Sequence, residues 1–276
     1  YDPRIKRRNI AAALQNRNFV LYEGDICDEI FCRVVFQREK PQKVVHLAAR
    51  AGVRPSIEEP LLYERVNCQG TLNLLELARR NAVSLFVFGS SSSIYGESAQ
   101  APFREDFPGD RPISPYAATK RAGELYAHIY HHLYGLNVTC LRFLTVYGPR
   151  QRPDLAIHKF TRLIEEGKPI PVFGDGSTSR DYTYFSDICD GILAALDRPM
   201  GYEIINLGNS SPVHLSTLIR LIEKALGKKA IIDRRPAQPG DVSITYADIS
   251  KARKLLGYEP RFPIQKGIQN YVKWFR

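Results

Sequence analysis

The chain has 276 residues, of which 44% are hydrophobic and 25% charged, and its formal net charge is +10. This composition suits a globular protein with one large domain or two smaller ones. No run of about 18 apolar residues is present, which argues against a membrane-spanning helix, and because no apolar run follows the basic N-terminus we expect no secretory signal. The cations are scattered outside residues 4–8 and no nucleic-acid module is recognisable, so we interpret the charge as a solvated basic surface or as attraction for an anionic substrate.

The cysteines indicate a reducing environment. Their number is odd, no CxxC pair occurs, and most lie in apolar runs: Cys27, Cys32, Cys68, Cys140 and Cys189. We therefore expect reduced, buried thiols in a cytoplasmic protein rather than disulfides or a zinc site.

Short β-branched runs alternate with longer amphipathic stretches through the first half of the chain. Strands are expected at residues 19–22, 44–47, 85–88 and 138–143, and helices at 29–38, 61–81 and 116–134. This alternation predicts a parallel sheet with helices on both faces, and the near-continuous apolar strands agree with it. The predicted fold class is therefore α/β with a doubly wound parallel sheet.

After Gly148 the sequence changes to polar loops, prolines and short strands, such as 169–173. A strand at 204–207 is expected to rejoin the main sheet, and helices are expected at 215–226, 251–256 and 264–275. We therefore predict a first domain of residues 1–148, to which 181–208 return, and a smaller second domain of 149–180 and 209–276.

One motif has the spacing of an acid–base pair. Tyr116 and Lys120 stand four residues apart at the start of a predicted helix and so share one of its faces. A nearby ammonium favours the phenolate and lowers the pKa of a tyrosine from about 10, as proton abstraction from a hydroxyl requires. Such a pair often occurs by chance, so it indicates a catalytic site only if other functional residues are expected beside it.

A serine-rich turn is the second motif expected beside Tyr116. Residues 90–96 follow the strand 85–88 directly, and strand ends at the carboxyl edge of an α/β sheet face the ligand crevice. A hydroxyl there can hydrogen-bond a substrate oxygen and the phenol of Tyr116. The alternative is an ordinary turn, but the order of strand end, loop and tyrosine on the next helix favours a site.

Together these motifs resemble the extended short-chain dehydrogenases. The segments that carry the resemblance run in order through the whole chain: His46–Ala49, Asn67, Gly89–Gly96, Tyr116–Lys120 and Arg180–Tyr184. It implies a Rossmann-like first domain, a retained NAD cofactor and a nucleoside-diphosphate-sugar substrate, which is a UDP-sugar here.

The resemblance also implies roles for single residues. By position, Ser91, Tyr116 and Lys120 match the catalytic triad, and Lys120 also holds the nicotinamide ribose. The positions that match cofactor-binding segments are Asp25, Ile26, Leu47, Ala48 and Ala49. Ordinary packing is the alternative for each, or a helix N-cap for Asp25. Asn67 matches a residue that braces the sheet or the cofactor, and for it this role and ordinary packing have equal claims.

The second domain is implied to hold the nucleotide. Positions that match substrate-binding segments are Ser91, Ser93, Phe173, Arg180 and Asp241. Arginine suits a diphosphate because its planar fork binds phosphate oxygens in pairs. Several relatives carry arginine where this chain has Gln238, which leaves that phosphate contact open.

The serine turn carries no carboxylic acid, and this limits the class of reaction that we expect. Sugar 4,6-dehydratases carry Asp-Glu after the catalytic hydroxyl, and related decarboxylases carry Glu at the second position, where this chain has Ser92 and Ser93. No carboxylic acid is there to protonate a leaving hydroxyl, so we predict epimerisation. The block 147–156 resembles UDP-glucuronate 4-epimerases, with Arg152 as the candidate partner of the sugar carboxylate and Arg150 as the alternative.

Other readings remain open at this point. The substrate can instead be UDP-glucose or a UDP-N-acetylhexosamine, and the chain can be a catalytically inactive fragment or relative. Family members usually dimerise through two helices, here 61–81 and 116–134, which predicts a homodimer. Three histidines, His128, His131 and His132, share the second helix, but the family uses no metal and we expect none.

One expected feature is absent from the sequence. A dinucleotide-binding sheet opens with a strand, a glycine-rich turn and a helix, and no such fingerprint occurs near the start. We therefore expect that the first βα unit, of roughly 30 residues or more, is missing and that the chain is part of a longer protein.

Overall fold

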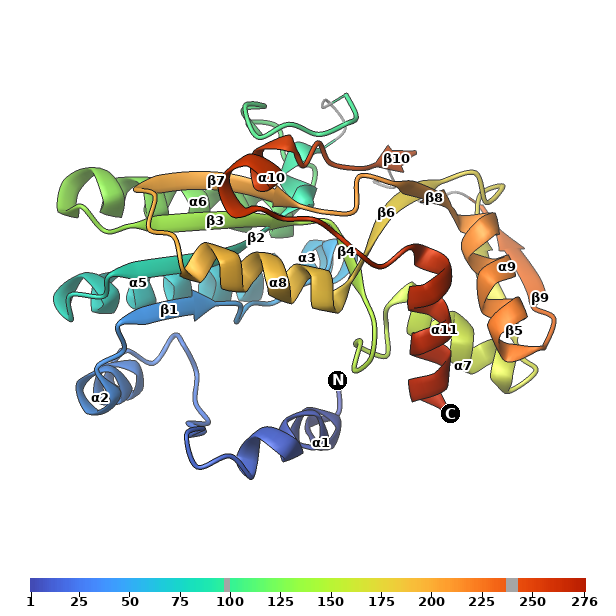
Figure 1. Ribbon diagram of the computed structural model, residues 1–276, viewed down its shortest axis with the longest axis horizontal. Coiled ribbons are helices and arrows are strands. Elements are labelled where there is room, and N and C mark those ends of the chain that lie inside the picture. The colour runs from blue at the N-terminus through green and yellow to red at the C-terminus, as the bar shows by residue number, and fades with distance from the viewer. Residues whose placement is uncertain (97–99, 237–242) are drawn as a thin grey trace.

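The main sheet of the computed structural model, which describes residues 1–96, 100–236 and 243–276, consists of parallel strands (Figure 1). Their order is β1–β2–β3–β7. The strands are β1 (Lys43–His46), β2 (Leu85–Ser91), β3 (Val138–Phe143) and β7 (Tyr202–Leu207). The α/β class with a parallel sheet is therefore confirmed, and the strand expected at 204–207 does rejoin this sheet.

Helices cover both faces of the sheet, because alternate residues of each strand point to opposite sides. Phe86 and Phe88 pack with one set of helices, and Leu85 and Val87 with the other. The first set is α2 (Glu29–Glu39), α5 (Gly70–Arg80) and α6 (Pro115–Tyr134), and the second is α8 (Phe185–Leu196) and α10 (Ser250–Leu256). Since α10 packs on the main sheet although it belongs to residues 209–276, the division into two domains stays a prediction.

The strand expected at residues 19–22 is wrong. This segment is extended but unpaired, and Phe19, Val20 and Leu21 are exposed. A strand needs a neighbour for its backbone groups, and β1, at the edge of the sheet, pairs only with β2 among the described residues. The preceding helix α1 (Pro3–Leu14) has no buried residue and lies apart from the sheet in Figure 1.

The long helix expected at 61–81 is continuous but not uniform. It consists of α4 (Pro60–Tyr63), a π-helical turn η1 (Glu64–Gln69) and α5, and the short α3 (Val53–Glu58) precedes it. A π-turn inserts a residue into the helical ladder and often marks a functional site. Here it lies beside α6, which it contacts.

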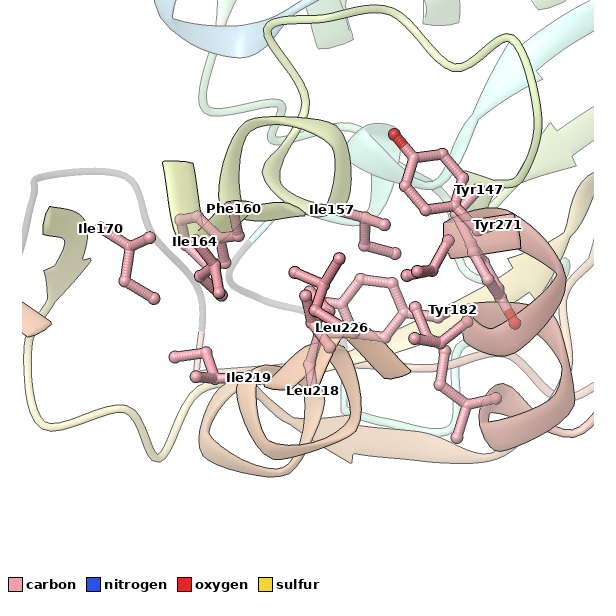
Figure 2. Packing of buried hydrophobic residues seen from close by; sticks show 14 of the residues in the cluster. Tyr147, Ile157, Phe160, Ile164, Ile170, Tyr182, Leu218, Ile219, Leu226 and Tyr271 are labelled. Atoms are coloured by element: carbon pink, nitrogen blue, oxygen red, sulfur yellow. The ribbon is translucent and has the colours of Figure 1, made fainter. Parts of the chain in front are cut away.

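The remaining elements form a second layer around their own core. Strands β4 (Thr145–Tyr147), β6 (Ser179–Tyr184), β8 (Pro212–His214) and β10 (Ile244–Thr245) form one small sheet, and β5 (Pro169–Phe173) pairs with β9 (Ile231–Arg235) in another. Helices α7 (Ala156–Glu165), α9 (Leu215–Leu226) and α11 (Ile264–Phe275) pack against them. Figure 2 shows how Ile157, Phe160 and Leu218 meet in this core. No helix in the described part of the chain is long and apolar enough to cross a membrane.

Candidate active site

The serine turn lies where β2 ends. Ser91, the last residue of β2, caps the short 3-10 helix η2 (Ser92–Tyr95): its Oγ accepts a hydrogen bond from the backbone N–H of Ser93 at 3.2 Å and lies 3.1 Å from the Ser93 hydroxyl. Both hydroxyls are thereby held at the carboxyl edge of the parallel sheet, the edge at which α/β proteins bind ligands.

Tyr116 opens helix α6 beside this turn. The Ser114 hydroxyl caps the helix by accepting from the Ala117 N–H at 3.2 Å, and Pro115 occupies the first turn. The ring of Tyr116 packs edge-to-face with Tyr63, with centroids 6.3 Å apart. Burial raises the pKa of Tyr116, while hydrogen bonding with Ser91 lowers it. Ser91 and Tyr116 are therefore brought together as the sequence analysis expects.

Lys120 lies one turn further along α6. Its ammonium donates to the Gly89 carbonyl at 2.6 Å and lies 5.0 Å from the centre of the Phe88 ring. Burial lowers the pKa of Lys120 to about 8. The expected lowering of the Tyr116 pKa by this ammonium is not found: burial dominates and raises that pKa, and the cation that lowers it is Arg152.

The segments matched to the cofactor lie at the same edge. Leu47 and Ala48 follow β1 directly and are exposed, and Leu47 packs over Gly89, where an added Cβ would lie 2.8 Å from it. Ile26 lies against Gly70 at the start of α5. Asp25 does not cap α2: its carboxylate accepts from the Cys27 N–H at 2.9 Å, and Asp28 is the N-cap instead.

Asn67 braces the loop after β1. Its side-chain amide accepts from the Arg50 N–H at 2.7 Å, donates to the Arg50 carbonyl at 3.0 Å, and donates to the Thr119 hydroxyl at 3.0 Å. These contacts favour the bracing role. They also join the π-helical turn to helix α6 between Tyr116 and Lys120.

Two neighbouring cavities open beside the serine turn. The first, of about 370 Å³, is lined by Ser92, Ser93 and Ser114. The second, of about 330 Å³, reaches Phe173. Both are lined by Arg54, Thr145 and Arg180, so they form one groove with cationic side chains that runs from the serine turn to the second layer.

The groove holds three of the expected substrate residues, Ser93, Phe173 and Arg180. Phe173 ends β5, and the guanidinium of Arg54 lies 5.1 Å from the centre of its ring. Arg180 lies on β6 and donates to the Ser179 carbonyl at 2.9 Å. Asp241, with the neighbouring Gln238, lies outside the described residues.

Arg152 lies near the tyrosine but is engaged elsewhere. Its positive charge lowers the pKa of Tyr116 and of Tyr63. Its guanidinium is paired with Asp154, through Nε at 3.1 Å and Nη2 at 2.7 Å, and Nη1 lies 3.4 Å from the Ala51 carbonyl. A ligand carboxylate has to share this fork with Asp154 or displace it.

Two contacts of the site were missed at the sequence level. Tyr63 packs on Tyr116 from a distant helix, and no sequence signal points to it. Glu124 lies four residues after Lys120, where the helical repeat already places it on the same face.

The histidines of α6 serve as packing residues. His128 and His132 lie with ring centroids 6.2 Å apart, His128 packs edge-on against Tyr202, and His131 is hydrogen-bonded to the Leu136 carbonyl at 3.0 Å. Within residues 1–96, 100–236 and 243–276, no group of three or more His, Cys, Asp or Glu side chains is arranged to hold a metal.

A parallel sheet with a serine turn at its carboxyl edge, opposite a half-buried tyrosine and a buried lysine on the next helix, defines an extended short-chain dehydrogenase. The chain belongs within that class to the GDP-mannose 4,6 dehydratase family, whose model matches residues 3–271. It is 45% identical over 275 residues to a UDP-glucuronate 4-epimerase of Thermodesulfobacterium geofontis, which covers 99% of this chain and 84% of that protein.

Two solved structures are similar as well. The UDP-glucuronic acid 4-epimerase of Bacillus cereus, in complex with UDP-glucuronic acid and NAD, is 36% identical with a TM-score of 0.91, covering 99% of this chain and 86% of that one. The UDP-glucose 4-epimerase of Thermotoga maritima, with UDP-glucose, is 34% identical with a TM-score of 0.90, covering 94% and 85%.

Proposed function

We propose that the protein is an NAD-dependent epimerase that inverts C4 of UDP-glucuronate to give UDP-galacturonate. The observation that carries the proposal is the groove itself, which joins the hydroxyls of the serine turn near Tyr116 to the cationic side chains of Arg54 and Arg180. Ser92 and Ser93 offer no acid for a dehydration. The relatives named UDP-glucuronate 4-epimerase support the choice of sugar.

The residues of the chain have distinct tasks in this reaction. Tyr116, as phenolate, takes the proton of the 4-hydroxyl and returns it after the 4-keto sugar has turned over. Ser91 holds the sugar oxygen and the phenol in line, and the Lys120 ammonium stabilises the developing negative charge. Arg180 and Phe173 would hold the diphosphate and the uracil, with Asp241 as a further contact.

The residues at the sheet edge fit a dinucleotide. Leu47 is 53% exposed although it is apolar, and it lies over Gly89, whose carbonyl binds Lys120. A flat ligand would cover this surface, with Leu47, Ala48 and Ala49 along its length and Asp25 and Ile26 toward its adenine end. NAD held by these residues would supply the acceptor and then the donor of the C4 hydride, and it would leave each turnover unchanged.

Arg152 is the proposed partner of the sugar carboxylate. It lies close enough to Tyr116 to lower its pKa, and a guanidinium binds a carboxylate through two parallel hydrogen bonds. Arg152→Met should raise the KM for UDP-glucuronate about tenfold or more while leaving that for UDP-glucose within about twofold, since a charged hydrogen bond contributes on the order of 1.5–3 kcal/mol. Arg150→Met is the matched control, and a loss with that variant instead would transfer the role to Arg150.

A second candidate function is UDP-glucose 4-epimerisation. The bidentate pairing of Arg152 with Asp154 favours it, because the fork is already occupied by a carboxylate of the chain. The fold-level likeness to a UDP-glucose 4-epimerase agrees with it.

The deciding experiment compares the two sugars. The protein at its full natural length, called the extended protein below, is incubated with UDP-glucuronate or UDP-glucose, and products are separated by chromatography. UDP-galacturonate from the first substrate supports the proposal, and turnover of UDP-glucose alone replaces it with the second candidate. Tyr116→Phe should abolish turnover without unfolding the protein, and retained activity would refute the role of Tyr116.

We also propose a homodimer formed by α6 and the helix that contains α5. A row of apolar side chains is exposed on these helices: Leu61, Leu72, Leu125, Ile129 and Leu133. Burying such a row is a common basis of subunit contact. Light scattering should show that Leu133→Glu shifts the protein to a monomer, whereas Leu193→Glu, on the exposed face of α8, should not; a monomeric wild type would refute the dimer.

A cytoplasmic location remains part of the proposal. The five cysteines are all free in the structure, as thiols of a reducing compartment would be. Cell fractionation with an antibody to the chain tests it, and recovery in the secreted fraction would contradict it.

A further inference from the structure

The carboxylate of Glu124 is fully buried beneath the serine turn, with no exposed surface. Its Oε1 accepts hydrogen bonds from the Ser90 hydroxyl at 2.7 Å and from Arg142 Nε at 2.8 Å. Its Oε2 accepts from Arg142 Nη2 at 2.8 Å and from Arg121 at 3.0 Å. Both oxygens are thus held by side chains from β2, β3 and α6.

The position of Glu124 relates it to the site. Residues 116, 120 and 124 are spaced by four and lie on one side of α6, while residues 89, 90 and 91 are consecutive in β2. Lys120 binds the Gly89 carbonyl, Glu124 binds the Ser90 hydroxyl, and Ser91 lies close enough to Tyr116 to lower its pKa. Gly89 and Ser90 are therefore tied to two turns of the helix, and Ser91 lies beside a third.

Stability alone does not account for the buried ion pair between Glu124 and Arg142. Arg142 is only 1% exposed, the Tyr95 ring lies 4.8 Å from its guanidinium, and its Nη1 has no hydrogen-bond partner among the residues that the structure describes. Removing two charges from water is costly, and apolar residues of similar volume usually stabilise a core as well or better. What the ion pair provides that apolar residues cannot is direction and charge.

The charge acts on Lys120. Burial lowers the pKa of Lys120, and the negative charge of Glu124 counteracts this by raising it. The other titratable groups packed here are uncharged near neutral pH: burial lowers the pKa of His46 on β1 to about 3 and raises those of Cys140 on β3 and Tyr202 on β7. Glu124 is therefore the anion that opposes the loss of charge by Lys120, with Arg142 and Arg121 as the surrounding cations.

We propose that Glu124 is a positioning residue for the reaction: it aligns the serine turn with α6 through Ser90 and keeps Lys120 in its charged form. The proposal rests on the catalytic roles assigned above to Ser91, Tyr116 and Lys120. Glu124 touches no substrate atom and acts through these neighbours.

Three variants of the extended protein separate this role from a merely structural one. Glu124→Gln removes the charge, Ser90→Ala removes only the link to β2, and Glu76→Gln is the matched control, because Glu76 also binds two arginines of its helix and a tyrosine but lies away from the serine turn. For Glu124→Gln we expect kcat per folded protein to fall on the order of ten- to a hundredfold with KM within about twofold, and the alkaline limb of kcat to move to lower pH. Ser90→Ala should lower kcat without moving the limb, and Glu76→Gln should change neither.

A spectroscopic titration makes the test independent of turnover. The side-chain nitrogen of Lys120, assigned by comparison with Lys120→Met, should titrate at lower pH in Glu124→Gln than in the wild type, and an unchanged midpoint would overturn the proposal. If Glu124→Gln does not fold, Ser90→Ala decides, and a kcat within about twofold of the wild type then overturns it. A wild-type protein inactive on every UDP-sugar would refute the proposed function, whereas altered variants of an active enzyme bear only on Glu124.

Discussion

Replacing Lys120 by methionine should make the protein more stable and inactive. The structure lowers the pKa of this buried ammonium from 10.5 to about 8. Each pKa unit corresponds to about 1.4 kcal/mol, so keeping the charge in the folded state costs about 3 kcal/mol. Loss of the hydrogen bond to the Gly89 carbonyl offsets about 1 kcal/mol of this. The expected gain in the free energy of unfolding at pH 7 is therefore about 2 kcal/mol.

The pH dependence of that gain follows from the direction of the shift. Below pH 8 Lys120 is charged in both the folded and the unfolded state, and the full cost applies. Between pH 8 and 10.5 the folded state releases its proton while the unfolded state keeps it, so the cost fades as the pH rises. At pH 9.5 about 1.4 kcal/mol of cost remains, and the advantage of the Lys120→Met variant should be close to zero.

Urea unfolding at pH 7 and pH 9.5 measures both quantities. Lys254→Met, an exposed lysine on α10, is the control and should be close to the wild type at each pH. A Lys120→Met variant that is less stable than the wild type at pH 7, or whose advantage does not change with pH, would refute the reasoning. The same variant should show no turnover, since stability is gained by removing a group the reaction needs.

Three further predictions concern packing and charge. Arg142→Met should lower the free energy of unfolding by about 3–5 kcal/mol, because it leaves the buried Glu124 carboxylate with Arg121 as its one remaining cationic partner in the described structure, and adding Glu124→Gln should recover most of the loss; equal stabilities of the single and double variants in urea would contradict this. Gly267→Ala would place a Cβ 1.8 Å from the hydroxyl oxygen of Tyr147, which is 1% exposed and tightly packed, so calorimetry should show a lower Tm, from about 1–3 kcal/mol of overpacking. Glu76, whose pKa its arginines lower to about 2, stabilises the protein above pH 4.5 and loses this effect as the pH falls toward 2, so Glu76→Gln should cost about 1 kcal/mol at pH 7 and nothing near pH 2.

Local signals were enough for much of the fold. Helices expected at 215–226 and 264–275 have those bounds in the structure, because each combines an apolar stripe with a clear start or stop, such as the left-handed Gly227 after α9. The strand at 19–22 failed for the opposite reason. Its apolar residues suit a strand, but a strand exists only where a neighbour accepts its hydrogen bonds.

The site could be predicted only in part for the same reason. Tyr116 and Lys120 share a helical repeat, and the serine turn follows a strand, so neighbouring residues reveal them. The pairing of Glu124 with Arg142 spans 18 residues and two elements, and no local pattern announces it. The groove that joins Arg54 to Phe173 arises only when distant loops meet.

The π-helical turn between α4 and α5 changes the direction in which the residues before and after it point. Buried residues recur at intervals of four through this segment, at Tyr63, Asn67, Thr71 and Leu75. In a regular α-helix each such step overshoots a full turn by about 40°, so Tyr63 and Leu75 would face directions about 120° apart. The wider turn absorbs this drift, so that Tyr63 and Asn67 contact helix α6 while Leu75 packs in the core. Deleting a single residue within 64–69 should therefore rotate Tyr63 and Asn67 away from Tyr116 while Leu75 stays in place. Length changes in this turn can thus alter the geometry of the site without changing the packing of the core.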